Sequence, residues 1–346
     1  MSELYPLLLK PQFVERIWGS RDLSPLFGPP PGEAPIGEVW LTGDDCQVAS
    51  GPLAGASLGE LCRRFGRDLV GETASETDRF PLLVKFLFPH GKLSVQVHPD
   101  DETALRAGLP CGKTECWYVL KAEPGAKVGL GLKLGTTREQ FARAIEEVRA
   151  EQLLNWIEVR EGEMIYVDAG TVHAIGPGVM LLETQQNSDT TYRLYDYGRP
   201  RDLHVEQGMQ ALKERTKAGK VEPWVRDENL VVLIWSPSFL VAKHRLGKDA
   251  GSSMEEYNAG EFKPGHKTYR KTVVCVALKG CGIIETRNSE PVTFASGEAV
   301  VVPAGLDWFR VVPQWEVEFL TMKLPSKEHK EELVRTEIPL IDSLGT

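Results

Sequence analysis

Four polar residues in the first half of the chain have the types and spacing of a metal site. Gln96 and His98 lie two apart in a predicted strand, so their side chains project from the same face. Glu115 lies in a second extended run, and His173 follows a third. Each residue alone has an ordinary explanation as a surface or hydrogen-bonded polar group. Together, two imidazoles, one carboxylate and one amide oxygen form a mixed donor set that suits zinc, and also iron or manganese.

An internal repeat surrounds the last of these residues. Residues 162–173 align without gaps with residues 297–308, and both copies read as a Gly-Glu turn, an apolar strand and a tight turn. The first copy ends in His173, whereas the second ends in Trp308, which cannot bind a metal. We interpret the copies as two related β-domains, the first with the metal ligands and the second without a metal. The alternative is two unrelated strands that share a common type of turn.

Longer stretches of the sequence point to a known family. Gly162, Gly170 and His173 have the spacing of the second cupin motif, with Asp168 where a proline is usual. Five further strings occur in order, at residues 80–87, 93–101, 112–115, 170–176 and 183–196. With these strings the chain resembles the type I mannose-6-phosphate isomerases (phosphomannose isomerases) in their short bacterial form, which belong to the cupin superfamily. The similarity extends from about residue 15 to about residue 212, and more faintly into the second repeat copy.

The resemblance implies a mainly β fold with two cupin-like jelly-roll domains, each a sandwich or barrel. We expect a catalytic domain at 1–221 and a metal-free domain at 222–346. A small helical insertion is predicted within the first domain, at about 136–157. Thr136 and Thr137 are the candidate caps, Glu139 and Gln140 complete the spacing of a helix capping box, and apolar residues recur at helical intervals after them.

The resemblance also implies the reaction, the reversible interconversion of mannose 6-phosphate and fructose 6-phosphate through an enediol intermediate. Such an aldose–ketose isomerase needs a base near the reacting carbon and positive charge near the oxygens. Gln96, His98, Glu115 and His173 match the family's ligands for one zinc ion per chain. Zinc would provide the positive charge, by polarising an oxygen or by holding a reactive water.

Four further residues are candidates for catalysis or substrate binding. Arg193 corresponds to the family's active-site arginine and can stabilise negative charge, although a structural ion pair is the alternative. Lys113 lies two residues before Glu115 and therefore faces the same pocket. Lys85 is a charge within an apolar strand, which is costly unless it is paired or functional. Asp189 matches a carboxylate proposed as the base in the family. The base stays open among Lys113, Lys85 and Asp189, and each could instead bind phosphate or support the ligands.

Composition limits the partners and the location. The chain has 346 residues, of which 42% are hydrophobic and 26% charged, as expected for a globular protein with substantial cores. Its net charge of −9 argues against a nucleic-acid surface, so the expected partner is a small sugar phosphate. There is no apolar run of about 20 residues and no export signal, so no membrane contact and a cytoplasmic location are expected. The six cysteines contain no CxxC pair, and no obligate protein partner is evident.

Two other classes of function remain open at this level. His/His/carboxylate ligation also suits an iron-dependent oxygenase on a cupin scaffold. A non-catalytic sugar-binding cupin could retain the same pocket without turnover, because a fold does not determine a function. Lys113 and Arg193 favour an anionic sugar intermediate and therefore the isomerase.

Overall fold

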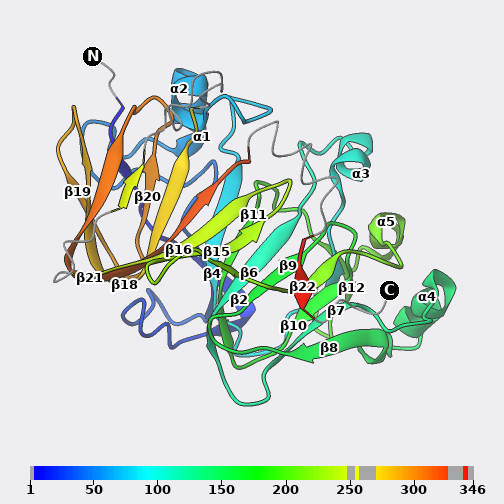
Figure 1. Ribbon diagram of the computed structural model, residues 1–346. Coiled ribbons are helices and arrows are strands. Elements are labelled where there is room, and N and C mark those ends of the chain that lie inside the picture. Colours follow the sequence, from blue (N-terminus) through cyan, green and yellow to red (C-terminus); the bar gives the residue numbers. More distant parts are fainter. Residues whose placement is uncertain (1–3, 248–253, 257–269, 326–337, 342–346) are drawn as a thin grey trace.

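A computed structural model describes residues 4–247, 254–256, 270–325 and 338–341 of the chain (Figure 1). These residues form three antiparallel sheets and a few short helices, which confirms the predicted mainly β class. The strand order of each sheet is open at both ends, so no sheet in these ranges closes into a barrel.

The central sheet has eight strands and is buried on both faces. Along its strand β6, Trp117 and Val119 contribute to one apolar core, while Cys116 and Tyr118 contribute to another. This alternation is the two-residue repeat of a strand. The strand order is β2-β3-β4-β11-β6-β9-β13-β22. The bounds are β2 Gln12–Ser20, β3 Ile36–Trp40, β4 Leu82–Leu87, β6 Glu115–Ala122, β9 Met164–Val167, β11 Val179–Gln186, β13 Ala218–Val221 and β22 Leu340–Ile341.

A five-stranded sheet packs against one face of the central sheet, in the order β12-β5-β10-β7-β8. Val128 and Leu130 of this sheet share a core with Trp117 and Ile165 of the central sheet. The two sheets therefore form a sandwich, and the candidate site lies between them. The bounds are β5 Val95–Val97, β7 Lys127–Leu132, β8 Leu154–Glu158, β10 His173–Ile175 and β12 Tyr192–Tyr195.

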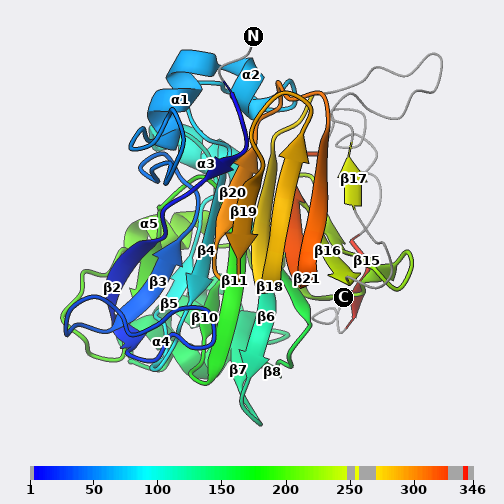
Figure 2. The same ribbon diagram turned by 90° about the vertical axis from the view of Figure 1, so that its left-hand side faces the viewer.

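A nine-stranded sheet packs against the other face of the central sheet (Figure 2). Val241 and Leu320 of this sheet share a core with Phe86 and Leu182 of the central sheet. The long strands β18 and β21 form its middle and pair with each other over most of their length. The bounds are β1 Leu7–Leu8, β14 Trp224–Val225, β15 Leu230–Trp235, β16 Leu240–Gly247, β17 Met254–Glu256, β18 Val273–Thr286, β19 Val292–Ala295, β20 Ala299–Val302 and β21 Phe309–Lys323.

The chain passes from the central sheet to the nine-stranded sheet between β13 and β14. This passage lies at the predicted boundary between residues 221 and 222. Two short strands cross the boundary in opposite directions: β1 pairs with β20, and β22 pairs with β13. The sequence did not indicate this exchange. The division into two domains stays a prediction, and the exchanged strands tie its two parts together.

The helices are short and connect strands. Of the two candidate caps, Thr137 precedes α4 and forms the capping box, because its hydroxyl accepts from the Gln140 backbone and the Gln140 side chain accepts from the Thr137 backbone. The predicted helical insertion at 136–157 is nevertheless too long. Val148 has a φ of 58°, which a right-handed helix cannot accommodate, and a 3-10 turn at 150–153 leads into strand β8. The bounds are α1 Leu58–Phe65, α2 Arg67–Val70, α3 Asp101–Arg106, α4 Arg138–Glu146 and α5 Val205–Ala211. Within the described ranges, none of the helices has the length and apolar character needed to cross a bilayer.

The two repeat copies have the same local structure. Gly162 and Gly297 have φ values of 87° and 86°, and each is followed two residues later by a four-residue strand, β9 or β20. This agreement supports the interpretation as a repeat. In the second copy, Trp308 lies beneath the guanidinium groups of Arg287 and Arg310, at 5.7 and 5.8 Å from its ring. That the second copy binds no metal stays a prediction.

A glycine in the long strand β18 offers a test of this sheet. Gly280 has a φ of 75°, and a Cβ added there would lie 1.9 Å from the carbonyl oxygen of Glu316. We expect Gly280→Ala to lower the free energy of unfolding by about 2 kcal/mol or more, because both the backbone angle and the contact are unfavourable. Urea denaturation measures the change. Gly28→Ala is the control, since a Cβ at Gly28 meets no atom within 4 Å; equal midpoints for the two variants would contradict the expectation.

Candidate metal centre and its pocket

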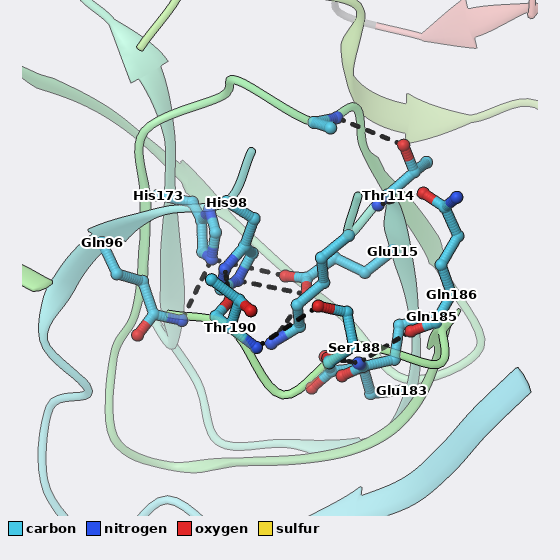
Figure 3. Close-up of polar contacts among 12 residues, drawn as sticks. Gln96, His98, Thr114, Glu115, His173, Glu183, Gln185, Gln186, Ser188 and Thr190 are labelled. Atoms are coloured by element: carbon cyan, nitrogen blue, oxygen red, sulfur yellow. Dashed lines mark hydrogen bonds and ion pairs between the residues drawn. The ribbon is translucent and has the colours of Figure 1, made fainter. Parts of the chain in front are cut away.

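The four predicted metal ligands come together between the central sheet and the five-stranded sheet. Gln96 of β5 is paired with His173 of β10 on one side and with Arg193 of β12 on the other. His98 follows directly after β5, and Glu115 begins β6 of the central sheet. Figure 3 shows the side chains of His98, His173 and Glu115 pointing toward one another. Strand pairing thus joins candidate ligands that are up to 77 residues apart in the sequence.

The distances among these three side chains fit one metal ion. His98 Nε2 lies 3.4 Å from Glu115 Oε2, and His173 Nε2 lies 3.3 Å from Glu115 Oε1. Two donors held tetrahedrally at about 2.1 Å from zinc are about 3.4 Å apart. One ligand atom from each residue lies within 4.8 Å of the others, and all three side chains are at most 2% exposed.

Hydrogen bonds orient both imidazoles toward the cluster. His98 Nδ1 lies 2.8 Å from the carbonyl oxygen of Thr190, and His173 Nδ1 lies 2.9 Å from that of Thr171. A carbonyl can only accept, so each Nδ1 carries the proton and each Nε2 presents a lone pair to the cluster. His98 Nε2 and Glu115 Oε2 are buried without a hydrogen-bond partner. Buried polar atoms rarely lack a partner, and a bound cation would satisfy both.

The protonation states also suit a cation. Burial, followed by the charge of Lys113, lowers the pKa of His98 to about 3, and burial lowers the pKa of His173. Burial alone would raise the pKa of Glu115, but His98 and Lys113 outweigh burial and hold this pKa well below its usual range. Neutral imidazoles and an ionised carboxylate are the forms that bind a metal.

Gln96 is close enough to be a fourth ligand. Its Nε2 lies 3.1 Å from His173 Nε2, and its Oε1 accepts from the Ser94 hydroxyl at 3.1 Å. A half-turn of the amide would direct Oε1 toward the cluster and Nε2 toward the Ser94 oxygen, which can accept. The amide oxygen can therefore approach a metal without losing its contact with Ser94.

The cluster adjoins a pocket of about 450 Å³. The pocket is lined by both signs of charge, which is unusual for a site buried between two sheets. His98 and His173 lie behind the lining, whereas Gln96 and Glu115 belong to it. The basic lining residues are Arg16, Lys85, Lys113, Arg193 and Arg201, and the acidic ones are Glu15, Glu38, Glu115, Glu183 and Asp189.

Lys85 is held between two carboxylates on the central sheet. Its Nζ lies 3.7 Å from Glu38 and 3.7 Å from Glu183. Burial on its own lowers the pKa of Lys85, but the charges of Glu183 and Glu38 outweigh it, so that the net pKa is raised. Arg16 completes this wall with two hydrogen bonds to Glu38, at 3.2 and 3.1 Å. Lys85 is therefore a buried cation that is already well compensated.

The other predicted residues differ in their surroundings. Lys113 is 3% exposed, and its Nζ lies 3.7 Å from Glu115 Oε2. Asp189 lines the pocket and is exposed. Arg193 donates from Nη1 to the carbonyl oxygen of Asp202 at 2.7 Å, and its buried Nε has no partner. Among the described residues it forms no ion pair with a carboxylate, so the structural ion pair that was the alternative for Arg193 is not present there.

The sequence has relatives of known name. The sequence-family model of the phosphomannose isomerase type I catalytic domain matches residues 7–118. A mannose-6-phosphate isomerase of Streptococcus mutans is 39% identical over 253 residues, which cover 70% of this chain and 79% of that protein. The mannose-6-phosphate isomerase ManA of Bacillus subtilis is 42% identical over 219 residues, which cover 60% of this chain and 68% of that protein. The chain belongs to the type I phosphomannose isomerase family.

Solved structures agree with this membership. The crystal structure of a Bacillus subtilis mannose 6-phosphate isomerase matches with a TM-score of 0.79 at 28% identity, over 92% of this chain and 99% of that chain. A variant of phosphomannose isomerase from Salmonella typhimurium matches with a TM-score of 0.71 at 16% identity, a likeness of fold alone. The match to the first structure confirms the predicted cupin-like fold.

Five charged residues that line the pocket were not predicted from the sequence: Glu15, Arg16, Glu38, Glu183 and Arg201. Glu183 had a signal, because it interrupts the apolar run of β11 as Lys85 interrupts that of β4. Glu38 had a weaker one, as a carboxylate in a short apolar strand. Arg201 lies in a loop rich in charges, and nothing in the sequence distinguished it from its neighbours.

Proposed function

We propose that the chain interconverts mannose 6-phosphate and fructose 6-phosphate as an aldose–ketose isomerase. The observation that carries the proposal is the His98–Glu115–His173 cluster beside a pocket lined by lysine and arginine side chains as well as carboxylates, in a member of the type I family. An isomerase of this kind must hold a sugar phosphate, stabilise negative charge on two oxygens and move one proton between neighbouring carbons. The pocket contains residues for each task.

Zinc is the metal that we assign to the site, one ion per chain. His98, Glu115 and His173 would hold it, and Gln96 would be the fourth ligand or would leave that position to water. The donor set of two imidazoles, a carboxylate and an open or weak fourth position is typical of catalytic zinc. When bound, zinc supplies positive charge that favours an ionised oxygen on the sugar.

Arg193 is the residue that we assign to charge stabilisation. It is paired with Gln96 on the neighbouring strand, so its side chain lies beside the ligands without being one of them. A guanidinium remains protonated at neutral pH and donates in a plane. It can therefore bind two sugar oxygens while the proton moves. We expect Lys113, Lys85 and Arg193 to contact the substrate.

The base transfers a proton from C2 of the aldose to C1 and takes it back in the reverse reaction. Lys113 and Asp189 are our candidates, because both line the pocket and Lys85 is compensated by two carboxylates. Exchange of substrate hydrogen with deuterated solvent distinguishes the candidates. The base is the residue whose replacement, Lys113→Ala or Asp189→Asn, abolishes exchange at saturating substrate while zinc remains bound.

Removal of the metal tests the proposed function directly. We expect the purified chain to isomerise mannose 6-phosphate in a coupled assay, to lose this activity on treatment with a chelator, and to regain it when zinc is added. Elemental analysis of the active protein should give one zinc per chain. An active protein without stoichiometric metal would exclude the zinc assignment. Oxygen consumption with iron-loaded protein and no isomerisation would favour the oxygenase class instead.

A further inference from the structure

The two walls of the pocket differ in how their cations are compensated. On the central sheet, Arg16 and Lys85 face Glu38 and Glu183, so each cation has a carboxylate within 4 Å. Asp189 adds its charge to this side, because it also acts on Lys85. This wall has little capacity for a further anion, since a second negative group would meet Glu38, whose pKa is lowered, in spite of its burial, to about 2 by the charges of Lys85 and Arg16.

The opposite wall, formed by β12 and the loop after it, has more cations than carboxylates to pair with them. Asp196, whose side chain is 2% exposed, is the shared carboxylate partner of Arg199 and Arg201. Arg201 uses Nε and Nη2 for this contact, at 2.7 and 2.6 Å. Arg193 has no carboxylate partner in the described part of the chain. Two guanidinium groups thus share one buried carboxylate, the charge of Arg201 acts on a third guanidinium, Arg193, and the nearby acid Asp202 is exposed.

The guanidinium groups on this wall are close enough to repel each other. Burial, followed by the charge of Arg201, lowers the pKa of Arg193. Like charges that share a site destabilise each other unless an anion lies near them. The third nitrogen of the Arg201 guanidinium, Nη1, donates to no acceptor within the described residues. The Arg201 side chain is 23% exposed, whereas those of His98, Glu115 and His173 are at most 2% exposed, so Arg201 lies closer to solvent than these three, toward the mouth of the pocket.

We propose that Arg201 binds the phosphate group of the substrate and selects phosphorylated over free sugars. The inference rests on the proposed function for the identity of the sugar. The phosphate is attached at C6, the end of the sugar away from C1 and C2. With C1 and C2 beside the metal ligands and Arg193, the phosphate extends toward the mouth. Asp196 holds the Arg201 guanidinium by two hydrogen bonds, so that its third nitrogen is presented to the phosphate in a fixed orientation.

The test compares Arg201→Gln with Arg199→Gln. Both variants remove one partner of Asp196 and leave the other, so both should keep the fold. Arg199 does not line the pocket as described, and it donates from Nη1 to the carbonyl oxygen of Lys92. Binding is measured by calorimetry on metal-replete protein with glucitol 6-phosphate, which cannot be isomerised. We expect Arg201→Gln to raise its dissociation constant about 10- to 100-fold and Arg199→Gln to change it less than about threefold. Arg201→Lys should recover part of the affinity, and KM for mannose 6-phosphate should rise with kcat little changed.

Several results would overturn the proposal. Arg201→Gln could leave the dissociation constant unchanged, or Arg199→Gln could weaken binding equally. Arg16→Gln could be the only variant that weakens binding, which would locate the phosphate on the opposite wall. Inorganic phosphate could bind the wild type as tightly as glucitol 6-phosphate, which would indicate a site for free phosphate. The measurements distinguish this inference from the proposed function. If glucitol 6-phosphate binding depends on Arg201 but the protein does not isomerise mannose 6-phosphate, the inference holds and the proposed reaction is rejected. If the protein isomerises mannose 6-phosphate but Arg201→Gln binds glucitol 6-phosphate as the wild type does, the reaction holds and the inference is rejected.

Discussion

Replacement of His173 by alanine should abolish metal binding and isomerisation together. His173 is fully buried, and its Nε2 lone pair faces Glu115, so no neighbouring group can take its place. With one imidazole missing, we expect bound zinc to fall from one per chain to a small fraction. Turnover should then fall by at least about 10³-fold, because a catalytic metal lowers the activation free energy by several kcal/mol. Elemental analysis and the coupled assay measure the two quantities on the same sample.

The control for this variant is His90→Gln. His90 is exposed in the turn after β4 and is not part of the cluster, so zinc content and turnover should both stay normal. Circular dichroism should show that His173→Ala remains a folded β protein, because the cores on both faces of the central sheet do not contain this side chain. Full zinc content in His173→Ala would exclude the histidine as a ligand. Full activity without zinc would exclude a catalytic metal.

The sequence predicted the candidate ligands because strands have a simple geometry. Gln96 and His98 are two residues apart, as are Lys113 and Glu115, and both pairs project into the same space. The sequence did not predict which strands would be neighbours. The pairing of β5 with β10 and β12 brings Gln96 beside His173 and Arg193, and it depends on contacts between distant parts of the chain.

The residues that were missed belong to the parts of the site that distant segments build. Glu38 and Lys85 meet because β3 and β4 are paired, and Glu183 joins them because β11 is the next strand. A single sequence shows a charge in an apolar run but not its partner. Arg201 could not be selected, because the role that we propose for it depends on the position of Asp196 and on the lack of a similar excess of cations across the pocket.

In the fold, too, features set by neighbouring residues were predicted, whereas features set by the pairing of distant segments were not. The helix start at Thr137 follows from side chains three residues apart, and the structure has the predicted capping box. The end of the same helix was predicted too late, because the pairing of β8 with β7 overrides the helical pattern after Val148. The exchange of β1 and β22 between sheets involves strands of two residues, which are too short to leave a pattern in the sequence.

Arg193→Ala should lower kcat strongly while KM changes less. The guanidinium lies beside the proposed ligands, and in the proposed reaction negative charge develops on the sugar oxygens there only as the proton moves. Losing one such donor typically lowers the rate about 10²- to 10³-fold. Zinc content and unfolding temperature should stay close to those of the wild type, because Arg193 is not a ligand and has no carboxylate partner among the described residues. Steady-state kinetics and elemental analysis together measure these effects.

Two further variants make the assignment specific to Arg193. Arg193→Lys keeps the charge but not the planar pair of donors, so it should recover only part of the lost kcat. Arg245→Ala removes an exposed arginine that pairs with Glu316 on the nine-stranded sheet, and its kinetics should be normal. A KM increase with normal kcat in Arg193→Ala would mean that the arginine binds substrate and transition state equally, as a phosphate contact would. Near-normal kcat and KM with full zinc would make Arg193 structural, and its buried, unpartnered Nε would then need another explanation.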